Sequence, residues 1–115
     1  MKSNYYINFL NLLKAIDQTA ESSQLDSTCK LILEEIAVNQ AADKLLTVSD
    51  VMGLKSLGSP ATLHRKLDVL LNTGFIKSVF QGTNRRTKFM VLTPMGEAYF
   101  ERLSTAITQA IPQNR

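Results

Sequence analysis

Apolar positions recur along this chain with two different periods, and each period predicts a type of element. Residues 4–21, 26–42 and 93–112 repeat their apolar side chains every three or four positions, the period of a helix with one buried face. A fourth such segment, from about residue 60 to 73, carries Leu63, Leu67, Leu70 and Leu71 on one face. Between residues 75 and 92 the period falls to two, which is typical of strands.

Capping residues predict where the helices begin and end. Asp26 can accept a backbone N–H at the start of the second helix. Ser59-Pro60 and Thr93-Pro94 each combine a capping hydroxyl with a proline at the first helical position, where its missing N–H costs nothing. Gly74 is expected to follow the end of the fourth helix, because glycine readily adopts the left-handed conformation found there.

Residues 75–92 predict a β-hairpin. Phe75–Phe80 and Thr87–Leu92 are the two strands, and the polar segment Gln81–Arg86 is the loop between them. Arg85 and Arg86 fall near the tip of this hairpin.

The segment before the fourth helix completes the predicted order of elements. Leu45–Thr47 is a strand stub, Thr47 can cap a short helix ending near Leu54, and Lys55–Gly58 is a turn. The order is helix, helix, strand stub, helix, turn, helix, hairpin, helix. It predicts a mainly helical α+β fold, the winged helix-turn-helix, as one domain over residues 1–115. Its central unit spans 45–93, with flanking helices at 4–42 and 94–111 that are candidates for dimerisation.

Charge is concentrated in the central unit. Residues 1–50 hold four Lys against seven Asp or Glu, a net charge of −3. Residues 51–93 hold seven Lys or Arg against Asp68 alone, a net charge of +6. A basic patch of this kind is typical of phosphate binding, although a solvated basic surface has the same composition.

Composition argues against most enzyme chemistry. His64 and Cys29 are the only histidine and cysteine, with no zinc-ligand spacing, and no GxSxG, GxGxxG or GxxxxGK[ST] motif occurs. We therefore expect no catalytic activity, metal or cofactor. Cys29 falls on a buried helical stripe, which favours a core residue over a reactive thiol. A single cysteine, no secretion signal and no apolar run near ~18 residues predict a cytoplasmic protein with no membrane span.

Three stretches resemble the MarR-type transcriptional regulators of bacteria. SPATLHRKL at 59–67 and LLNTGFI at 70–76 resemble the recognition helix and the start of the wing. NRRTKFMVLTPMG at 84–96 is similar to the wing pattern of that family, Asp-x-Arg, an apolar residue, Leu-Thr and an early helical glycine. Asn84 stands in place of the aspartate. The resemblance implies a cytoplasmic, homodimeric, DNA-binding repressor or activator that pairs through its terminal helices.

The fourth helix supplies the first group of candidate site residues. A helix of this type enters the major groove, where arginine can pair with guanine and threonine can contact a base. Thr62 and Arg65 are therefore the expected base readers, and Lys66 a phosphate contact. His64 is either a phosphate contact or a flank of the core, and Ser59 a cap whose neighbouring amides can hold a phosphate. Helical periodicity predicts an outer face of Ala61, Thr62, Arg65, Asp68, Val69 and Asn72. For Val69, packing and a thymine contact are both open.

The wing supplies the second group. The wing, residues 81–86, can reach the DNA backbone or the minor groove, where the negative potential favours arginine. Arg86 is the leading candidate, because it matches the wing arginine of the family. Arg85 and Lys88 are expected on the DNA backbone.

Two functions remain open from the sequence. The first is sequence-specific binding of double-stranded DNA by a small dimeric regulator. The alternative is a winged helix that serves as a protein-interaction module in a replication or plasmid-maintenance complex. The broad apolar arc of the first helix permits dimerisation but also suits a helix deep in its own core.

Overall fold

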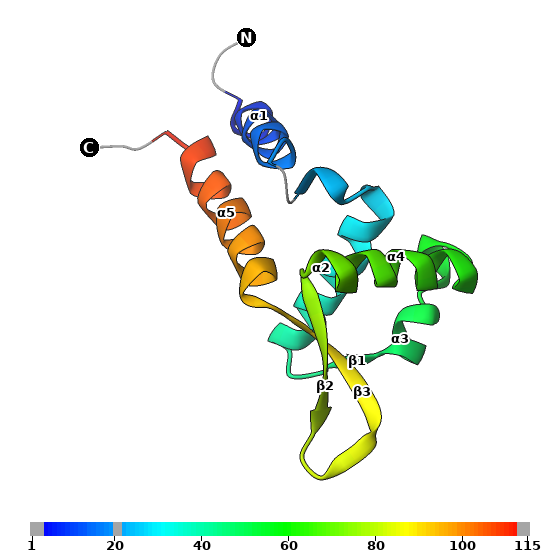
Figure 1. Ribbon diagram of the computed structural model, residues 1–115. Helices are drawn as coiled ribbons and strands as arrows, with labels where there is room; N and C mark the ends of the chain where they lie inside the picture. The colour runs from blue at the N-terminus through cyan, green and yellow to red at the C-terminus, as the bar shows by residue number, and fades with distance from the viewer. Residues whose placement is uncertain (1–3, 20–21, 113–115) are drawn as a thin grey trace.

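The computed structural model describes residues 4–19 and 22–112, and within them five helices and three strands (Figure 1). In chain order they are α1 (Tyr5–Asp17), α2 (Ser27–Ala41), β1 (Leu46–Thr47), α3 (Val48–Met52), α4 (Pro60–Thr73), β2 (Ile76–Gln81), β3 (Asn84–Leu92) and α5 (Pro94–Ala110). Short 3-10 turns, η1 (Ser22–Gln24) and η2 (Lys55–Leu57), precede α2 and α4. This order confirms the predicted mainly helical α+β winged helix-turn-helix.

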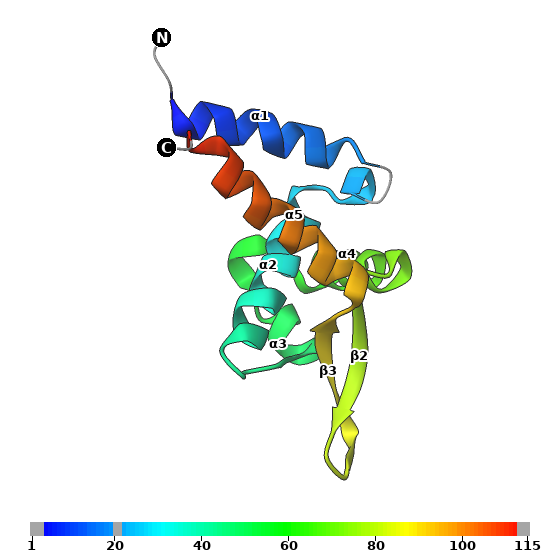
Figure 2. The same ribbon diagram turned by 90° about the vertical axis from the view of Figure 1, so that its left-hand side faces the viewer.

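The three strands form one antiparallel sheet in the order β1-β3-β2. The stub β1 pairs with β3 through Leu46 opposite Met90 and Thr47 opposite Phe89. The hairpin of β2 and β3 is the wing, and its far end extends beyond the helices in both views (Figures 1 and 2).

The core lies where α2 and α4 meet the sheet. Each helix contributes the apolar face that its three- and four-residue spacing predicts. The fully buried side chains are Cys29, Ile32, Leu33 and Ile36 from α2, Leu63, Leu67 and Leu70 from α4, Phe75, Ile76 and Met90 from the hairpin region, and Val51 from α3. Tyr99 of α5 joins them edge-on to Phe75, with ring centroids 5.8 Å apart.

Local hydrogen bonds confirm the predicted helix starts. The side chains of Asp26, Thr47, Ser59 and Thr93 each accept the backbone N–H three residues further on. Thr47 and Asp50 make a reciprocal capping box at α3. Gly74 ends α4 with φ of 89°, in the left-handed conformation expected of it.

Helices α1 and α5 lie side by side at the end of the molecule opposite the wing (Figures 1 and 2). The Asn8 side chain donates to the carbonyl oxygen of Ala110 across this pair, at 3.2 Å. No residue of α1 is buried. The helix therefore sits on the outside of the core rather than deep within it.

Three predicted boundaries were wrong. Helix α1 ends at Asp17 rather than near residue 21, and just beyond its end the Thr19 hydroxyl donates to the carbonyl oxygen of Ile16 at 2.9 Å. Residues 20 and 21, at the predicted end of this helix, lie outside the described residues. Helix α3 ends at Met52 rather than near Leu54. The wing loop is only Gly82 and Thr83, since Asn84 already pairs with Gln81.

Candidate nucleic-acid interface

Helix α4 begins at a well-made cap. The Ser59 hydroxyl accepts the backbone N–H of Thr62 at 3.2 Å and lies 3.1 Å from the Thr62 hydroxyl. Pro60 occupies the first helical position. A Cβ added to Gly58 would meet the Thr62 side chain at 3.4 Å, so Thr62 packs over the preceding turn. Ser59 and Thr62 are thus placed by the cap itself.

The exposed face of α4 is turned slightly from the predicted one. After Pro60, which is also exposed, its exposed residues are Ala61, His64, Arg65, Asp68 and Asn72. Thr62 and Val69 are half-buried, and Val69 packs against the core. Of the two alternatives for Val69, the structure supports packing against the core. On this flank of α4, Thr62 packs over the turn at Gly58, and Lys66 pairs with Asp26 at the start of α2.

Lys66 does not lie on this exposed face. Its side chain is half-buried, and Nζ is 2.5 Å from Asp26 Oδ2 at the start of α2. The hydrogen bond from Lys66, together with the backbone N–H of Cys29, lowers the pKa of Asp26 to about 2. The ammonium group of Lys66 is thus engaged by α2 in this structure, and its role as a phosphate contact stays a prediction.

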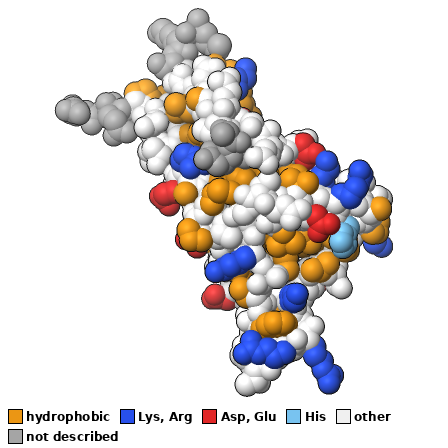
Figure 3. Space-filling view, viewed as in Figure 1, with side chains coloured by type: hydrophobic (Ala, Val, Ile, Leu, Met, Phe, Trp, Pro, Cys, Tyr) orange, Lys and Arg blue, Asp and Glu red, His pale blue; other side chains and the backbone are white. Residues whose placement is uncertain are grey.

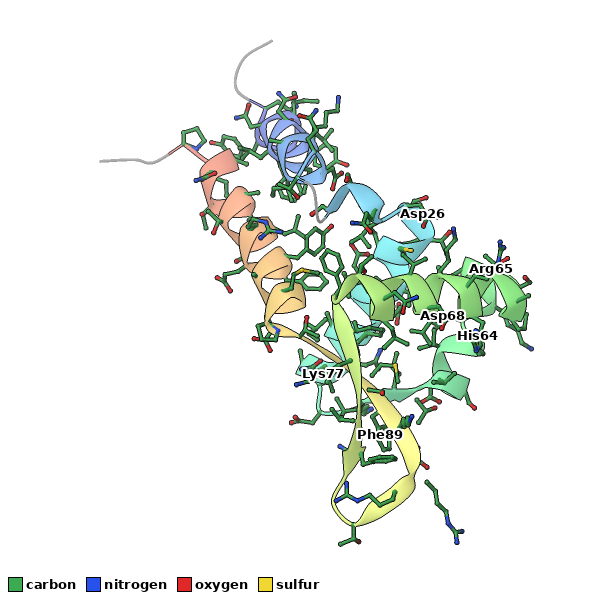
Figure 4. All side chains as sticks on the ribbon, viewed as in Figure 1. Asp26, His64, Arg65, Asp68, Lys77 and Phe89 are labelled. Carbon is green, nitrogen blue, oxygen red and sulfur yellow. The ribbon has the colours of Figure 1, made fainter. Side chains whose placement is uncertain are left out.

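His64 and Arg65 remain available to a ligand (Figure 4). His64 Nδ1 lies 3.4 Å from Asp68 Oδ2, one helical turn away, and both side chains are more than half exposed. Arg65 Nη2 lies 3.4 Å from the Thr62 hydroxyl, which leaves the guanidinium group exposed beside Thr62.

The β3 side of the wing carries three cations whose charges are not neutralised. Arg85, Arg86 and Lys88 are exposed, and none takes part in an ion pair found within residues 4–19 and 22–112. The Arg85 guanidinium carbon lies 5.5 Å from the centre of the Phe80 ring. Lys and Arg side chains gather at the wing end and over α4 on the face shown in Figure 3.

Asn84 retains the local hydrogen bond of the wing. Its Oδ1 accepts the backbone N–H of Arg86 at 2.9 Å. An amide oxygen can make this contact without a charge. The substitution of asparagine for the expected aspartate therefore leaves the Arg86 backbone held in place.

A groove runs between the wing and the start of α3. Its volume is about 420 Å³. The lining residues are Thr47, Val48, Ser49, Phe80, Arg85, Arg86, Thr87 and Lys88. Sequence reasoning missed Thr47, Ser49 and Phe80 as parts of this surface. The signal for Phe80 was an aromatic residue at the strand end next to a basic loop, whereas nothing local links residues 47–49 to the wing.

Other chemistry finds little support among the described residues. They hold no group of three His, Cys, Asp or Glu side chains placed to bind a metal. Burial raises the pKa of Cys29 to about 11, which keeps its sulfur as a thiol. No helix in this part of the chain is both long and apolar enough to cross a bilayer.

The fold and the basic surface define a winged helix-turn-helix protein. Its likeness to a MarR-like transcriptional regulator from Thermotoga maritima has a TM-score of 0.65 at 16% sequence identity, over 91% of this chain and 74% of that one. A mutant of MepR from S. aureus matches with a TM-score of 0.60 at 20% identity, again over 91% and 74%. The heme sensor protein PefR from Streptococcus agalactiae, in complex with heme, matches with a TM-score of 0.55 at 17% identity, over 90% and 65%.

These likenesses show a shared fold, so the resemblance seen in the sequence extends to the architecture. No family model matches the sequence, and no curated protein matches it.

Proposed function

We propose that this protein is a dimeric regulator that binds double-stranded DNA in a sequence-specific manner in the cytoplasm. The observation that carries the proposal is the placement of exposed cations without an ion-pair partner on both α4, at Arg65, and the wing, at Arg85, Arg86 and Lys88. Cations on a helix and on a neighbouring hairpin match the two grooves of a duplex. An interaction surface for a protein does not require both.

Each group has a distinct role in this proposal. Arg65 reads a base in the major groove, where its guanidinium group can pair with guanine. The Thr62 hydroxyl helps to orient that group. His64 lies beside them as a phosphate contact, and Ser59 caps the helix whose first amides face the backbone. Arg86 enters the minor groove, while Arg85 and Lys88 contact the backbone.

The exposed apolar surface of α1 and α5 supports pairing with a second copy of the chain. Tyr5, Tyr6, Ile107 and Ile111 are each between 46% and 66% exposed, and they line a common groove. Water-exposed apolar side chains gathered on one face favour association. A second copy would cover this surface and leave both wings free at the other end.

The test is selection from a randomised duplex library at two salt concentrations, followed by sequencing. We expect a two-fold symmetric motif with half-sites about 10 base pairs apart, or a multiple of that. We also expect affinity that falls as salt rises. Salt-sensitive binding without a motif would indicate an architectural role, and no binding at low salt would favour the protein-interaction alternative.

Substitution of the two key arginines separates base reading from backbone binding. Arg65→Ala should weaken binding to the selected site by about 1–3 kcal/mol and relax the preference at one base pair. Arg86→Ala should weaken all duplexes more evenly. The measurement is affinity for the selected site and for single-base variants of it, with Lys14→Ala on α1 as a control. An equal loss at every sequence for Arg65→Ala would contradict its base-reading role.

A further inference from the structure

We propose that the groove between the wing and α3 binds a phosphate group of the DNA backbone, and that Phe80 positions Arg85 for it. This inference rests on the proposed function. We call this site the wing groove; it is lined by Thr47, Val48, Ser49, Phe80 and residues 85–88.

An irregular hairpin register makes the wing groove possible. Val79 lies opposite Phe89, and Gln81 lies opposite Asn84. Between these two pairs, β2 has one residue, Phe80, whereas β3 has four, residues 85–88. In a regular strand, alternate side chains point to opposite faces. The bulge lets all four consecutive residues line one groove, so Arg85, Arg86 and Lys88 gather on the same side.

The electrostatics of the wing groove favour an anion. It has three cations in its lining and no acidic residue. The adjacent carboxylate of Asp50 is turned to the backbone N–H of Thr47, which it accepts at 2.9 Å. Hydroxyl groups of Thr47, Ser49 and Thr87 add uncharged donors. Crowded cations without a counter-charge repel each other, and a bound phosphate group would relieve that repulsion.

The contact between Phe80 and Arg85 suits a phosphate in particular. The guanidinium carbon lies 5.5 Å from the ring centre, within the range of a cation–π interaction. The N–H donors of arginine lie at the edges of its plane and can bind phosphate in pairs. A ring attracts the cation through the face of the ring and needs none of these donors. Phe80, 37% exposed, therefore acts as a positioning residue.

The size of the wing groove favours a backbone phosphate over a free ion. Its volume of about 420 Å³ leaves room for the sugars on either side of a phosphodiester. One wall belongs to the wing and the other to α3, the helix that precedes α4. A DNA strand bound in the wing groove would lie beside the major groove that α4 enters. The protein would then contact the duplex at two places.

Three variants test the positioning role by affinity for one fixed duplex. Phe80→Leu keeps an apolar side chain but removes the ring, and should weaken binding about two- to fivefold. Phe80→Tyr keeps the ring and should bind like the wild type. Arg85→Gln should lower the slope of log affinity against log salt by about one. Adding Phe80→Leu to Arg85→Gln should cause no further loss, because the cation that the ring positions is already absent.

A second measurement addresses the phosphate site directly. Inorganic phosphate should shift the NMR signals of Thr47, Ser49 and Arg85 in the wild type, beyond the effect of sodium chloride at equal ionic strength. Equal losses from Phe80→Leu in the two backgrounds, or an unchanged salt slope in Arg85→Gln, would overturn the proposal. If the wild type bound no duplex, the proposed function would fail. Phosphate shifts at the wing groove would then support a free phosphate ligand, and their absence would overturn the site altogether.

Discussion

Asp26 has two roles in this fold, and both depend on its charge or its oxygen atoms. One oxygen accepts the backbone N–H of Cys29 at 2.8 Å and caps α2. The other lies 2.5 Å from Lys66 Nζ on α4. A single side chain therefore joins the start of one core helix to the flank of the proposed recognition helix.

The lowered pKa of Asp26 predicts a loss of stability in acid. Its pKa falls from an ordinary 3.8 to about 2 in the folded chain. The stabilisation is therefore complete above the unfolded value and is lost as pH falls from about 5 to about 2. Because the side chain is 49% exposed, solvent screening reduces the effect to about 1 kcal/mol.

Asp26→Asn isolates this charge, since asparagine is also a good cap. We expect a free energy of unfolding about 1 kcal/mol lower at pH 7 and a flatter dependence on pH between 5 and 2. Urea unfolding across that range measures both quantities. Lys66→Gln removes the partner and should give a similar curve. An unchanged acid dependence in both variants would contradict the assignment.

At the scale of elements, the junction between the hairpin and α5 leaves no room for a side chain at Gly96. A Cβ there would lie 2.2 Å from the carbonyl oxygen of Phe75. That carbonyl also accepts the backbone N–H of Thr93 at 3.1 Å, so it is held from moving away. The early glycine of this helix is thus a packing requirement.

Gly96→Ala should lower the free energy of unfolding by about 3 kcal/mol, because the added methyl group forces the strand end and the helix apart. Urea unfolding at neutral pH measures the loss. Ser104→Ala, an exposed change on the same helix, should stay within about 0.5 kcal/mol of the wild type. A Gly96→Ala variant as stable as this control would refute the close approach.

The elements could be predicted from sequence wherever their signals are local. Caps at Ser59 and Thr93, the proline after each, and Gly74 all act within one helical turn, so their positions were found correctly. The half-burial of Lys66 and Val69 was not predicted, because the buried side of α4 depends on where α2 lies, which periodicity does not give. The bulge in the wing was missed for the same reason, since register is a property of two strands.

The molecule as a whole divides its surface between two ends. The wing carries exposed cations at one end, Arg65 of α4 lies nearer the middle, and α1 with α5 exposes apolar side chains at the other end (Figures 1 and 3). The molecule measures 54 × 29 × 25 Å, so the two surfaces are well separated. Pairing at one end would leave the other open to a ligand.

Ile107→Glu should abolish the proposed dimer, because it places a charge within the exposed apolar surface, where Ile107 is 53% exposed. Light scattering should give a mass near 12.8 kDa for the variant and twice that for the wild type. Leu31→Glu is the control, since Leu31 is an exposed apolar residue on α2 outside this surface. A wild type that stays monomeric at high concentration would rule the dimer out.

The burial of Cys29 has a practical consequence for measurements of unfolding. Cys29 is 1% exposed, and its sulfur lies 3.9 Å from the carbonyl oxygen of Lys66, between α2 and α4. A thiol reagent can reach it only when α2 and α4 separate. The rate at which a thiol reagent labels the native protein therefore reports how often the core opens. Unfolding can be followed through Cys29 without an added probe.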